Sequence, residues 1–90
     1  MNVVFLDRFG RDLDAIRDTK MQTRIAAIIE EIEGADTLSA IQNLKKMKGY
    51  AVSYRIRIGD YRLGIYFEND TVELARIVHR KDIYKYFPNE

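Results

Sequence analysis

Three arginines stand at alternating positions around a Gly59-Asp60 pair: Arg55, Arg57 and Arg62. The alternating apolar residues between them predict two β-strands joined by a two-residue turn, and this alternation places the arginines on one face of a sheet. Arginine stays protonated in proteins and can hold two oxygens of one phosphate group. The spacing therefore predicts a surface that binds a phosphodiester and stabilises negative charge on it.

A second set of reactive residue types lies near the end of the chain, in the order His79-Arg80-Lys81-Asp82-Ile83-Tyr84-Lys85-Tyr86. Histidine titrates near neutral pH without any perturbation, and a phenol can donate a proton or a hydrogen bond. We expect His79, Arg80 and Tyr84 to lie at one rim of the arginine-bearing face. The simpler alternatives are a structural histidine and tyrosines that only pack a terminal turn.

The net charge of +1 conceals an uneven distribution. Residues 1–43 carry a net charge of −3, and residues 44–90 carry a net charge of +4. Between residues 44 and 62 the only acid is Asp60, whereas Lys45, Lys46 and Lys48 lie close together. A local field of this sign attracts a polyanion, although basic stretches also occur on ordinary solvated surfaces.

Composition narrows the class of protein. The chain has 47% hydrophobic residues, which is ordinary for a globular domain, and no cysteine, which excludes disulfides and thiolate metal sites. We read no signal peptide at the start and no run near the roughly 20 apolar residues that a membrane-spanning helix needs. We expect one domain over residues 1–90, in the cytoplasm, with no membrane association, no metal and no cofactor.

The first half of the chain predicts a strand over residues 2–6 followed by two helices. The first helix is predicted from apolar residues spaced four and three apart and from an aspartate N-cap: Phe9, Leu13, Ile16 and Asp7. The second helix is predicted from one apolar stripe: Met21, Ile25, Ile28, Ile29 and Ile32. Asp18 or Thr19 can cap its start, and we expect Gly34 to end it in the left-handed conformation.

The second half predicts strands over 53–58, 61–67 and 71–78, with turns at Gly59-Asp60 and Asn69-Asp70 and a short helix within 81–87. The element order is β-α-α-β-β-β(-α). This order predicts an α+β protein of one domain, in which the two N-terminal helices pack on one face of an antiparallel sheet.

Two-residue turns fix the register of antiparallel strands, so cross-strand neighbours follow from the sequence. The expected pairs are Arg57 with Arg62, Arg55 with Gly64, Gly64 with Ala75, and Arg62 with Ile77. Tyr66 and His79 would then share the arginine face. Arg76 would turn toward the helices, where an acid near a sheet edge could pair with it.

Two features of the arginine face favour a bound anion. Arg57 directly opposite Arg62 is an unfavourable pair of like charges. Gly64 and Ala75 beside Arg55 leave a shallow floor on which a substrate could lie. The alternative is a solvated outer face, on which arginine and tyrosine serve only as good strand formers.

Three stretches of the chain resemble the RelE/ParE superfamily of bacterial and archaeal toxin–antitoxin toxins. They are Leu44-Lys45-Lys46-Met47 with Gly49, the hairpin Tyr54-Arg55-Ile56-Arg57 and Asp60-Tyr61-Arg62-Leu63, and the ending His79-Arg80-Lys81-Asp82-Ile83-Tyr84. The hairpin and the ending together make the likeness specific, and the order of elements matches as well. The chain resembles the RelE-like branch more than the ParE-like branch.

The resemblance implies a toxin that enters the ribosomal A site and cleaves mRNA without a metal, through attack of a ribose 2′-OH on the adjacent phosphate. Arg62 and Arg80 match family arginines that hold the scissile phosphate. The implied catalytic residues are Arg55, Arg57, Arg62, His79, Arg80 and Tyr84, and the implied RNA-binding or ribosome-binding residues are Lys45, Lys46, Lys48, Lys81 and Tyr86. The C-terminal tyrosine of the family matches Tyr84, or Tyr86 if a longer spacing applies. The implied partners are mRNA, ribosomal RNA and a cognate antitoxin in a hetero-oligomeric complex.

Two other functions are compatible with the same fold. A ParE-like toxin would block DNA gyrase and cleave nothing, and such toxins generally lack the basic and aromatic residues of the nuclease. An inactive homologue would still bind its antitoxin. Retention of Arg55, Arg57, Arg62, Arg80 and Tyr84 favours the nuclease.

Overall fold

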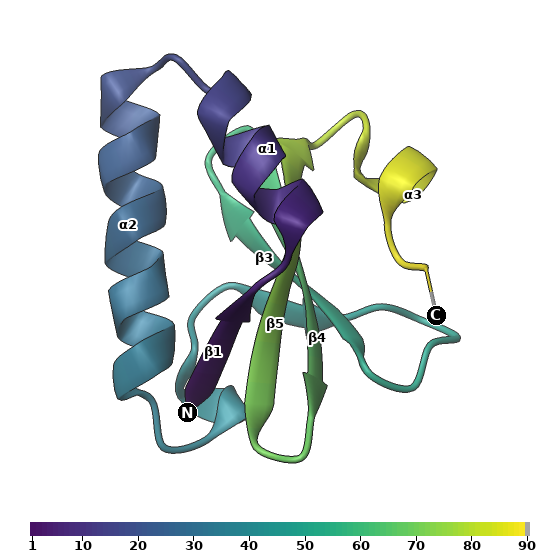
Figure 1. Cartoon of the computed structure of the whole chain (residues 1–90). Helices are drawn as coiled ribbons and strands as arrows, with labels where there is room; N and C mark the ends of the chain where they lie inside the picture. The colour runs from purple at the N-terminus through teal and green to yellow at the C-terminus, as the bar shows by residue number, and fades with distance from the viewer. Residues whose placement is uncertain (90) are drawn as a thin grey trace.

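The structure is a computed structural model that describes residues 1–89, and it consists of one five-stranded sheet with helices on both of its faces (Figure 1). The elements are β1 (Asn2–Phe5), α1 (Asp7–Ala15), α2 (Thr19–Gly34), a 3-10 turn (Leu38–Ala40), β2 (Leu44–Lys46), β3 (Ser53–Ile58), β4 (Tyr61–Glu68), β5 (Thr71–His79) and α3 (Ile83–Tyr86). The predicted α+β class and the order of its main elements are confirmed. No helix within residues 1–89 is long and apolar enough to cross a membrane.

The sheet has the order β1-β5-β4-β3-β2, and it is mixed. Strands β3, β4 and β5 are antiparallel neighbours, as predicted. Residues 44–46, which were not predicted as a strand, form β2 antiparallel to β3, and β1 pairs with β5 in parallel. The expectation of a wholly antiparallel sheet was therefore wrong. The reason lies in the connection: α1 and α2 carry the chain from β1 across the sheet, so no hairpin constrains the direction of β1. The backbone of β1 instead pairs with β5. This pairing extends to the residue after β1, because the Leu6 N–H donates a hydrogen bond to the Leu74 carbonyl at 3.1 Å.

The ends of the two helices differ from the prediction in two places. Asp18 caps α2 as expected, because its Oδ1 accepts hydrogen bonds from the amides of Lys20 (2.9 Å) and Met21 (3.2 Å). Asp7 does not cap α1, since the N-cap position is Leu6, and Asp7 lies in the first turn.

Gly34 is the last residue of α2, and the chain leaves through Ala35 in an extended conformation, not through a left-handed glycine. The Met1 ammonium donates hydrogen bonds to the carbonyls of Glu33 (3.1 Å) and Ala35 (2.9 Å) at this helix end. The bond to Glu33 satisfies one of the carbonyls that the last turn of a helix leaves without a partner.

Both predicted hairpin turns are present. Gly59 has a φ of 59°, and Asn69 and Asp70 have φ values of 53° and 56°, the left-handed pair that a type I′ turn requires. The β3–β4 register is as predicted, with Arg57 opposite Arg62 and Arg55 opposite Gly64. These cross-strand pairs fix the arginine positions on the sheet.

The β4–β5 register is only partly as predicted, because it shifts between Gly64 and Ile65. Tyr66 lies opposite Glu73 as expected, but Gly64 lies opposite Arg76, and Arg62 lies opposite Val78. The predicted pairs of Gly64 with Ala75 and of Arg62 with Ile77 were therefore wrong.

The cause of the shift is burial of β5 side chains. Leu74 and Ile77 are 0% and 1% exposed in the core under α1 and α2, although residues three apart in a regular strand face opposite sides. The extra residue of a β-bulge allows both to face the core.

The face of the sheet opposite α1 and α2 carries a second, smaller core. Met47, Ala75, Ile83 and Phe87 are buried there, so α3 and the segment after it cover part of this face (Figure 1). The Phe87 ring lies directly on Gly64, where an added Cβ would be 2.7 Å from the Phe87 Cγ. The predicted open floor beside Arg55 is therefore filled by this ring.

This contact predicts that Gly64→Ala lowers the free energy of unfolding by about 1–3 kcal/mol, because the new methyl group overlaps a buried ring. Urea denaturation measures the change. Gly10→Ala in α1 is the matched control: nothing lies near the added methyl group, and the helix should gain about 0.5–1 kcal/mol. Equal behaviour of the two variants would contradict the packing described for Phe87.

Candidate functional site

Four arginines converge at the end of the sheet that carries the Gly59-Asp60 turn, and we call them the arginine cluster: Arg55, Arg57, Arg62 and Arg80. Burial lowers the pKa of Arg62 below its usual value. The positive charges of the other three arginines lower this pKa further, and Asp60 offsets part of the effect. The four groups therefore lie close enough together for their like charges to act on Arg62.

The main chain and neutral side chains hold the arginine cluster in place. Arg62 Nη1 donates to the carbonyls of Gly59 (2.9 Å) and Tyr61 (3.0 Å), and the Arg80 amide donates to the Asp60 carbonyl (2.8 Å). Arg57 Nη2 donates to Asn43 Oδ1 at 3.4 Å. These contacts position the cations without cancelling their charge.

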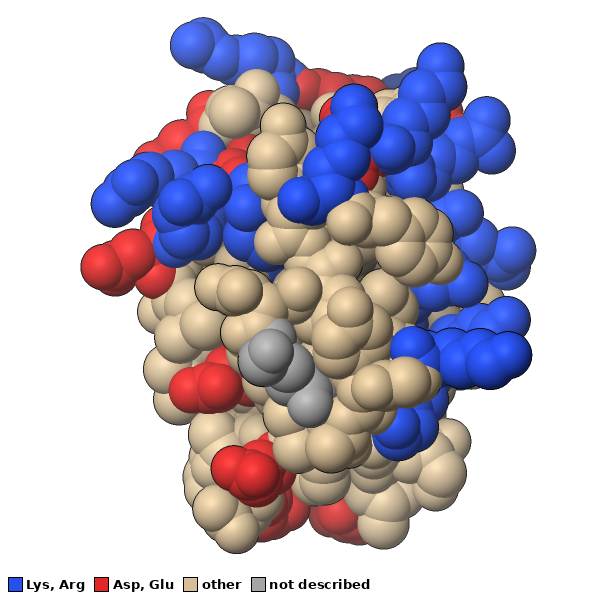
Figure 2. All heavy atoms as spheres, turned by 90° about the vertical axis from the view of Figure 1, so that its right-hand side faces the viewer, with Lys and Arg blue, Asp and Glu red and all other residues tan. Residues whose placement is uncertain are grey.

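No carboxylate of residues 1–89 forms an ion pair with the arginine cluster. The ion pairs in this part of the chain are Arg76 with Asp12 and Lys85 with Asp82. Figure 2 shows Lys and Arg gathered over the top and the right-hand edge of the face that carries the C-terminal segment, whereas acids lie mainly at its left and bottom. The positive charge is thus available to an anionic ligand.

A hollow of about 360 Å³ adjoins Arg55, and we call it the lysine groove. Its polar lining consists of Lys45, Lys46, Lys48, Tyr50, Arg55 and Tyr84. Lys45 lies directly opposite Arg55 across the β2–β3 pair, and the Arg55 guanidinium carbon is 6.0 Å from the centre of the Tyr84 ring. Tyr84 is 67% exposed, so both its ring and its hydroxyl can be reached.

Tyr50, which lies in the loop after β2 and is 39% exposed, was not among the residues predicted from the sequence. Its main-chain carbonyl accepts a hydrogen bond from Lys46 Nζ, and Gly49 before it has a φ of 86°, which favours glycine. A signal was present: an aromatic residue follows a lysine-rich stretch, and proteins that bind single-stranded nucleic acids combine basic grooves with aromatic side chains.

His79 does not share the arginine face, contrary to the prediction. Because of the β-bulge it lies opposite Tyr61 and on the same side as Ile77, which belongs to the core under α1 and α2. Its ring packs edge-on against the Tyr61 ring with the ring centres 5.9 Å apart, and its Nδ1 accepts a hydrogen bond from the Lys81 amide at 3.2 Å. This histidine has structural partners on the opposite side of the sheet from Arg62.

Two other predicted residues lie away from the lysine groove. Tyr86 projects from the other side of α3, where the Arg76 guanidinium carbon is 4.9 Å from its ring centre. Lys81 is exposed at the turn before α3 and lines neither the lysine groove nor the hollow that contains Tyr86. The structure thus separates Tyr84 from Tyr86.

Arg76 pairs with an acid, as the sequence suggested, but it lies opposite Gly64 on the face that carries α3, so the prediction that it turns toward the two N-terminal helices was wrong. Its Nε and Nη2 donate to the two carboxylate oxygens of Asp12 in α1, at 2.7 and 3.0 Å, and these bonds raise the pKa of Arg76. Asp12 Oδ2 also accepts the Ile77 amide at 3.0 Å. One carboxylate therefore ties α1 to β5 just beyond the bulge.

Within residues 1–89, no group of three or more His, Asp or Glu side chains is arranged to hold a metal ion. The site that the structure assembles consists of guanidinium, ammonium and phenol groups. Such groups can bind a phosphate, stabilise negative charge on it and donate hydrogen bonds to its oxygens.

Comparisons with known proteins agree over nearly the whole chain. The family model of the ParE toxin of the parDE type II toxin–antitoxin system matches residues 3–84. Toxin RelE3 of Methanocaldococcus jannaschii is 43% identical over 89 residues, which cover 98% of this chain and 100% of that protein.

Solved structures give the same result. A chain in the crystal structure of the RelB-RelE antitoxin–toxin complex from Methanococcus jannaschii has a TM-score of 0.81 and 41% identity, with 94% of this chain and 99% of that chain covered. The YoeB dimer structure from Staphylococcus aureus has a TM-score of 0.71 at 20% identity, with 89% and 97% covered, a likeness of fold alone.

These matches define the class of protein as the toxins of type II toxin–antitoxin systems. The chain belongs to the ParE toxin family of these systems and is a RelE-like toxin. The resemblance found in the sequence is thereby confirmed.

The Arg76–Asp12 pair predicts that Asp12→Ala lowers the free energy of unfolding by about 2–4 kcal/mol, because it leaves a largely buried guanidinium and an amide without their acceptor. Asp82→Ala removes the exposed pair with Lys85 and should change stability by less than about 1 kcal/mol. Chemical denaturation of both variants tests this difference, and a loss for Asp12→Ala as small as that for Asp82→Ala would contradict it.

Proposed function

We propose that the protein is a ribosome-dependent endoribonuclease that cleaves mRNA and so inhibits translation. The supporting observation is the arginine cluster, in which four guanidinium groups meet without a carboxylate partner among residues 1–89. The cluster adjoins a groove lined by lysines and an exposed phenol. This arrangement matches the requirements for binding RNA and for stabilising the negative charge on a phosphate in the transition state.

The proposed reaction is a transesterification within the RNA strand. The ribose 2′-hydroxyl loses its proton to solvent as its oxygen forms a bond to the adjacent phosphorus, and the bond from phosphorus to the 5′-oxygen breaks as that oxygen takes up a proton. The products are a 2′,3′-cyclic phosphate and a 5′-hydroxyl. Arg62 and Arg80 would hold the non-bridging oxygens, on which negative charge grows, and Arg57 would add to the same field.

Proton transfer needs a different group, because arginine is a poor acid or base. Tyr84 is the best-placed candidate: its exposed phenol lies beside Arg55 at the rim of the lysine groove. We assign to it the donation of a proton to the leaving 5′-oxygen. His79 faces the other side of the sheet and is therefore a weaker candidate for contact with the reacting atoms.

The lysines of the groove have the simpler role of binding RNA backbone. Lys45, Lys46 and Lys48 are exposed, and none forms an ion pair with another part of residues 1–89. In the proposed function they bind the phosphates of ribosomal RNA and the messenger.

A cognate antitoxin is the proposed protein partner. The related RelE structures from Methanococcus jannaschii and Pyrococcus horikoshii are complexes with RelB. Here a hollow of about 300 Å³ lies along α1 and α2, with Leu13, Ile25 and Ile29 in its wall, and an apolar antitoxin segment could dock in it.

Inhibition of DNA gyrase is a second candidate function, favoured by one observation: the matching family model describes ParE toxins. The arginine cluster and Tyr84 have no evident use in that activity. A gyrase supercoiling assay with the purified protein distinguishes the two. Inhibition of supercoiling without cleavage of translated message would replace the nuclease proposal.

The main test is cleavage of a translated mRNA in a cell-free extract, with 5′ ends mapped by primer extension. Wild-type protein should produce new ends only on translated message. Arg62→Ala and Arg80→Ala should each reduce cleavage by about 100-fold or more, because each removes charge stabilisation from the transition state.

Arg17→Ala, which changes an exposed arginine between α1 and α2, is the matched control and should cleave like the wild type. Circular dichroism shows whether each variant is folded. A folded Arg62→Ala/Arg80→Ala variant that cleaves at the wild-type rate would overturn the assignment.

The two C-terminal tyrosines should differ in their effect on cleavage. Tyr84→Phe removes only a hydroxyl and should slow cleavage by at least about tenfold, since it deletes the proposed proton donor. Tyr86→Phe should change the rate less than twofold. Single-turnover cleavage on stalled ribosomes measures both, and a wild-type rate for Tyr84→Phe would remove the phenol from the mechanism.

Ribosome binding should depend on salt through the lysine groove. For Lys46→Ala/Lys48→Ala the slope of log affinity against log salt should fall by about 0.7–0.9 for each lost phosphate contact. Filter binding at several potassium concentrations measures this slope. An unchanged slope would contradict the proposed contact of these lysines with RNA phosphates.

A further inference from the structure

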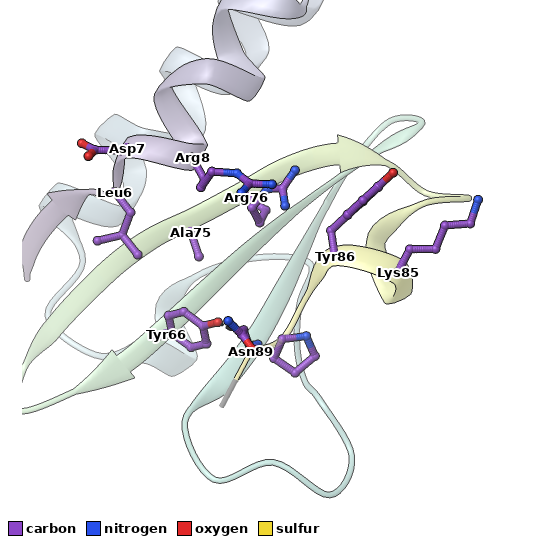
Figure 3. A pocket seen from close by; sticks show the side chains of 10 residues that line it. Leu6, Asp7, Arg8, Tyr66, Ala75, Arg76, Lys85, Tyr86 and Asn89 are labelled. Atoms are coloured by element: carbon purple, nitrogen blue, oxygen red, sulfur yellow. Dashed lines mark hydrogen bonds between the residues drawn. The ribbon is translucent and has the colours of Figure 1, made fainter.

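A second and larger hollow, of about 580 Å³, lies on the other side of α3 from the lysine groove, and we call it the aromatic hollow. Its walls come from three parts of the chain: the β1–α1 junction, strands β4 and β5, and the C-terminal segment (Figure 3). The lining residues that could contact a ligand are Arg8, Tyr66, Arg76, Lys85, Tyr86 and Asn89. Nothing in the proposed cleavage reaction uses this hollow.

Two tyrosines give the aromatic hollow surfaces for stacking. The Arg76 guanidinium covers one face of Tyr86, yet 51% of the residue remains exposed. Tyr66 packs against Phe87 with ring centres 5.1 Å apart, and its hydroxyl oxygen accepts the Asn89 amide at 2.9 Å. Both rings are therefore held by neighbours and can present a surface to a planar group.

The charge on the lining is suited to an anion. Asp12 offsets the charge of Arg76, and Lys85 forms an exposed pair with Asp82. Arg8 forms no ion pair within residues 1–89, so its charge is available. The acid in the lining is Asp7, and Figure 3 shows its side chain directed away from Arg76 and Tyr86.

The aromatic hollow and the lysine groove are neighbours that share Pro88 as a common wall. A single strand of RNA that lies in the lysine groove and crosses the C-terminal segment reaches the aromatic hollow. Aromatic rings stack on any base, and nearby cations bind the backbone that carries it. An acidic peptide would use the cations but gain less from two tyrosine rings.

We propose that the aromatic hollow binds a second nucleotide of the same single-stranded RNA, with its base stacked on Tyr86 and its phosphate near Arg8. This inference rests on the proposed function in one respect, namely that the ligand is RNA. It adds a binding subsite that is separate from the arginine cluster. The subsite would strengthen binding of the RNA strand with little dependence on which base occupies that position.

The test uses hexauridylate in which every ribose is 2′-O-methylated, so that binding is measured without cleavage. Six further probes each lack one base at a different position. Fluorescence anisotropy gives the dissociation constant of each labelled probe with the wild type and with Tyr86→Leu. For the wild type, removal of one particular base should weaken binding about fivefold, as expected for the loss of one stacked base.

In Tyr86→Leu the intact probe should bind about fivefold more weakly, and removal of that same base should have no further effect. Tyr86→Phe keeps the ring and should behave like the wild type. Arg8→Ala should weaken binding of the intact probe, whereas Arg11→Ala, an exposed residue of α1 outside the hollow, should not. The base penalty is the loss of affinity on removal of one base from the probe. In Tyr84→Leu this penalty should disappear at a different position of the probe.

The inference is overturned if the wild type binds no probe, or if no base penalty disappears in Tyr86→Leu. It is also overturned if Tyr86→Leu and Arg8→Ala weaken binding of the antitoxin but leave every RNA affinity unchanged, since the hollow would then serve a protein partner. Cleavage is measured separately on unmodified message. Base penalties without cleavage would support the subsite and reject the nuclease, and cleavage without base penalties would do the reverse.

Discussion

The β-bulge between β4 and β5 determines what each face of the sheet carries. Without the extra residue, Leu74 and Ile77 could not both lie in the core under α1 and α2. The same shift removes His79 from the arginine face and places Ala75 beneath the C-terminal segment. One local irregularity of the backbone therefore separates the residues that build the core from those available to a ligand.

The arginine cluster meets an opposing constraint, because its members repel one another and Arg62 is partly desolvated. Acidic partners would neutralise the arginines and so remove the repulsion, but they would also remove the capacity of the cluster to bind an anion. The fold instead uses carbonyl oxygens of the Gly59-Asp60 turn and an asparagine amide to hold the arginines. Neutral acceptors fix the geometry and leave the net charge intact, so a bound anion would relieve the unfavourable energy.

Much of this arrangement could be predicted from the sequence, because local patterns determine it. Alternation and the Gly59-Asp60 turn placed Arg57 opposite Arg62, and the helical apolar stripe located α2. The errors arose where long-range packing decides. The bulge depends on burial of Leu74 and Ile77, the parallel pairing of β1 depends on the helical crossover, and the cover over Gly64 depends on Phe87, which is 23 residues along the chain. No local pattern contains that information.

Phe87 packs at the centre of the face that carries α3. Its ring seals the backbone at Gly64, supports Tyr66 on one side and lines the lysine groove on the other. The two hollows are therefore not independent, because Phe87 lines the lysine groove and supports Tyr66 in the wall of the aromatic hollow. A substitution at Phe87 during evolution would change the shape of both hollows at once. The ligand preferences of the two hollows should therefore change together among related proteins.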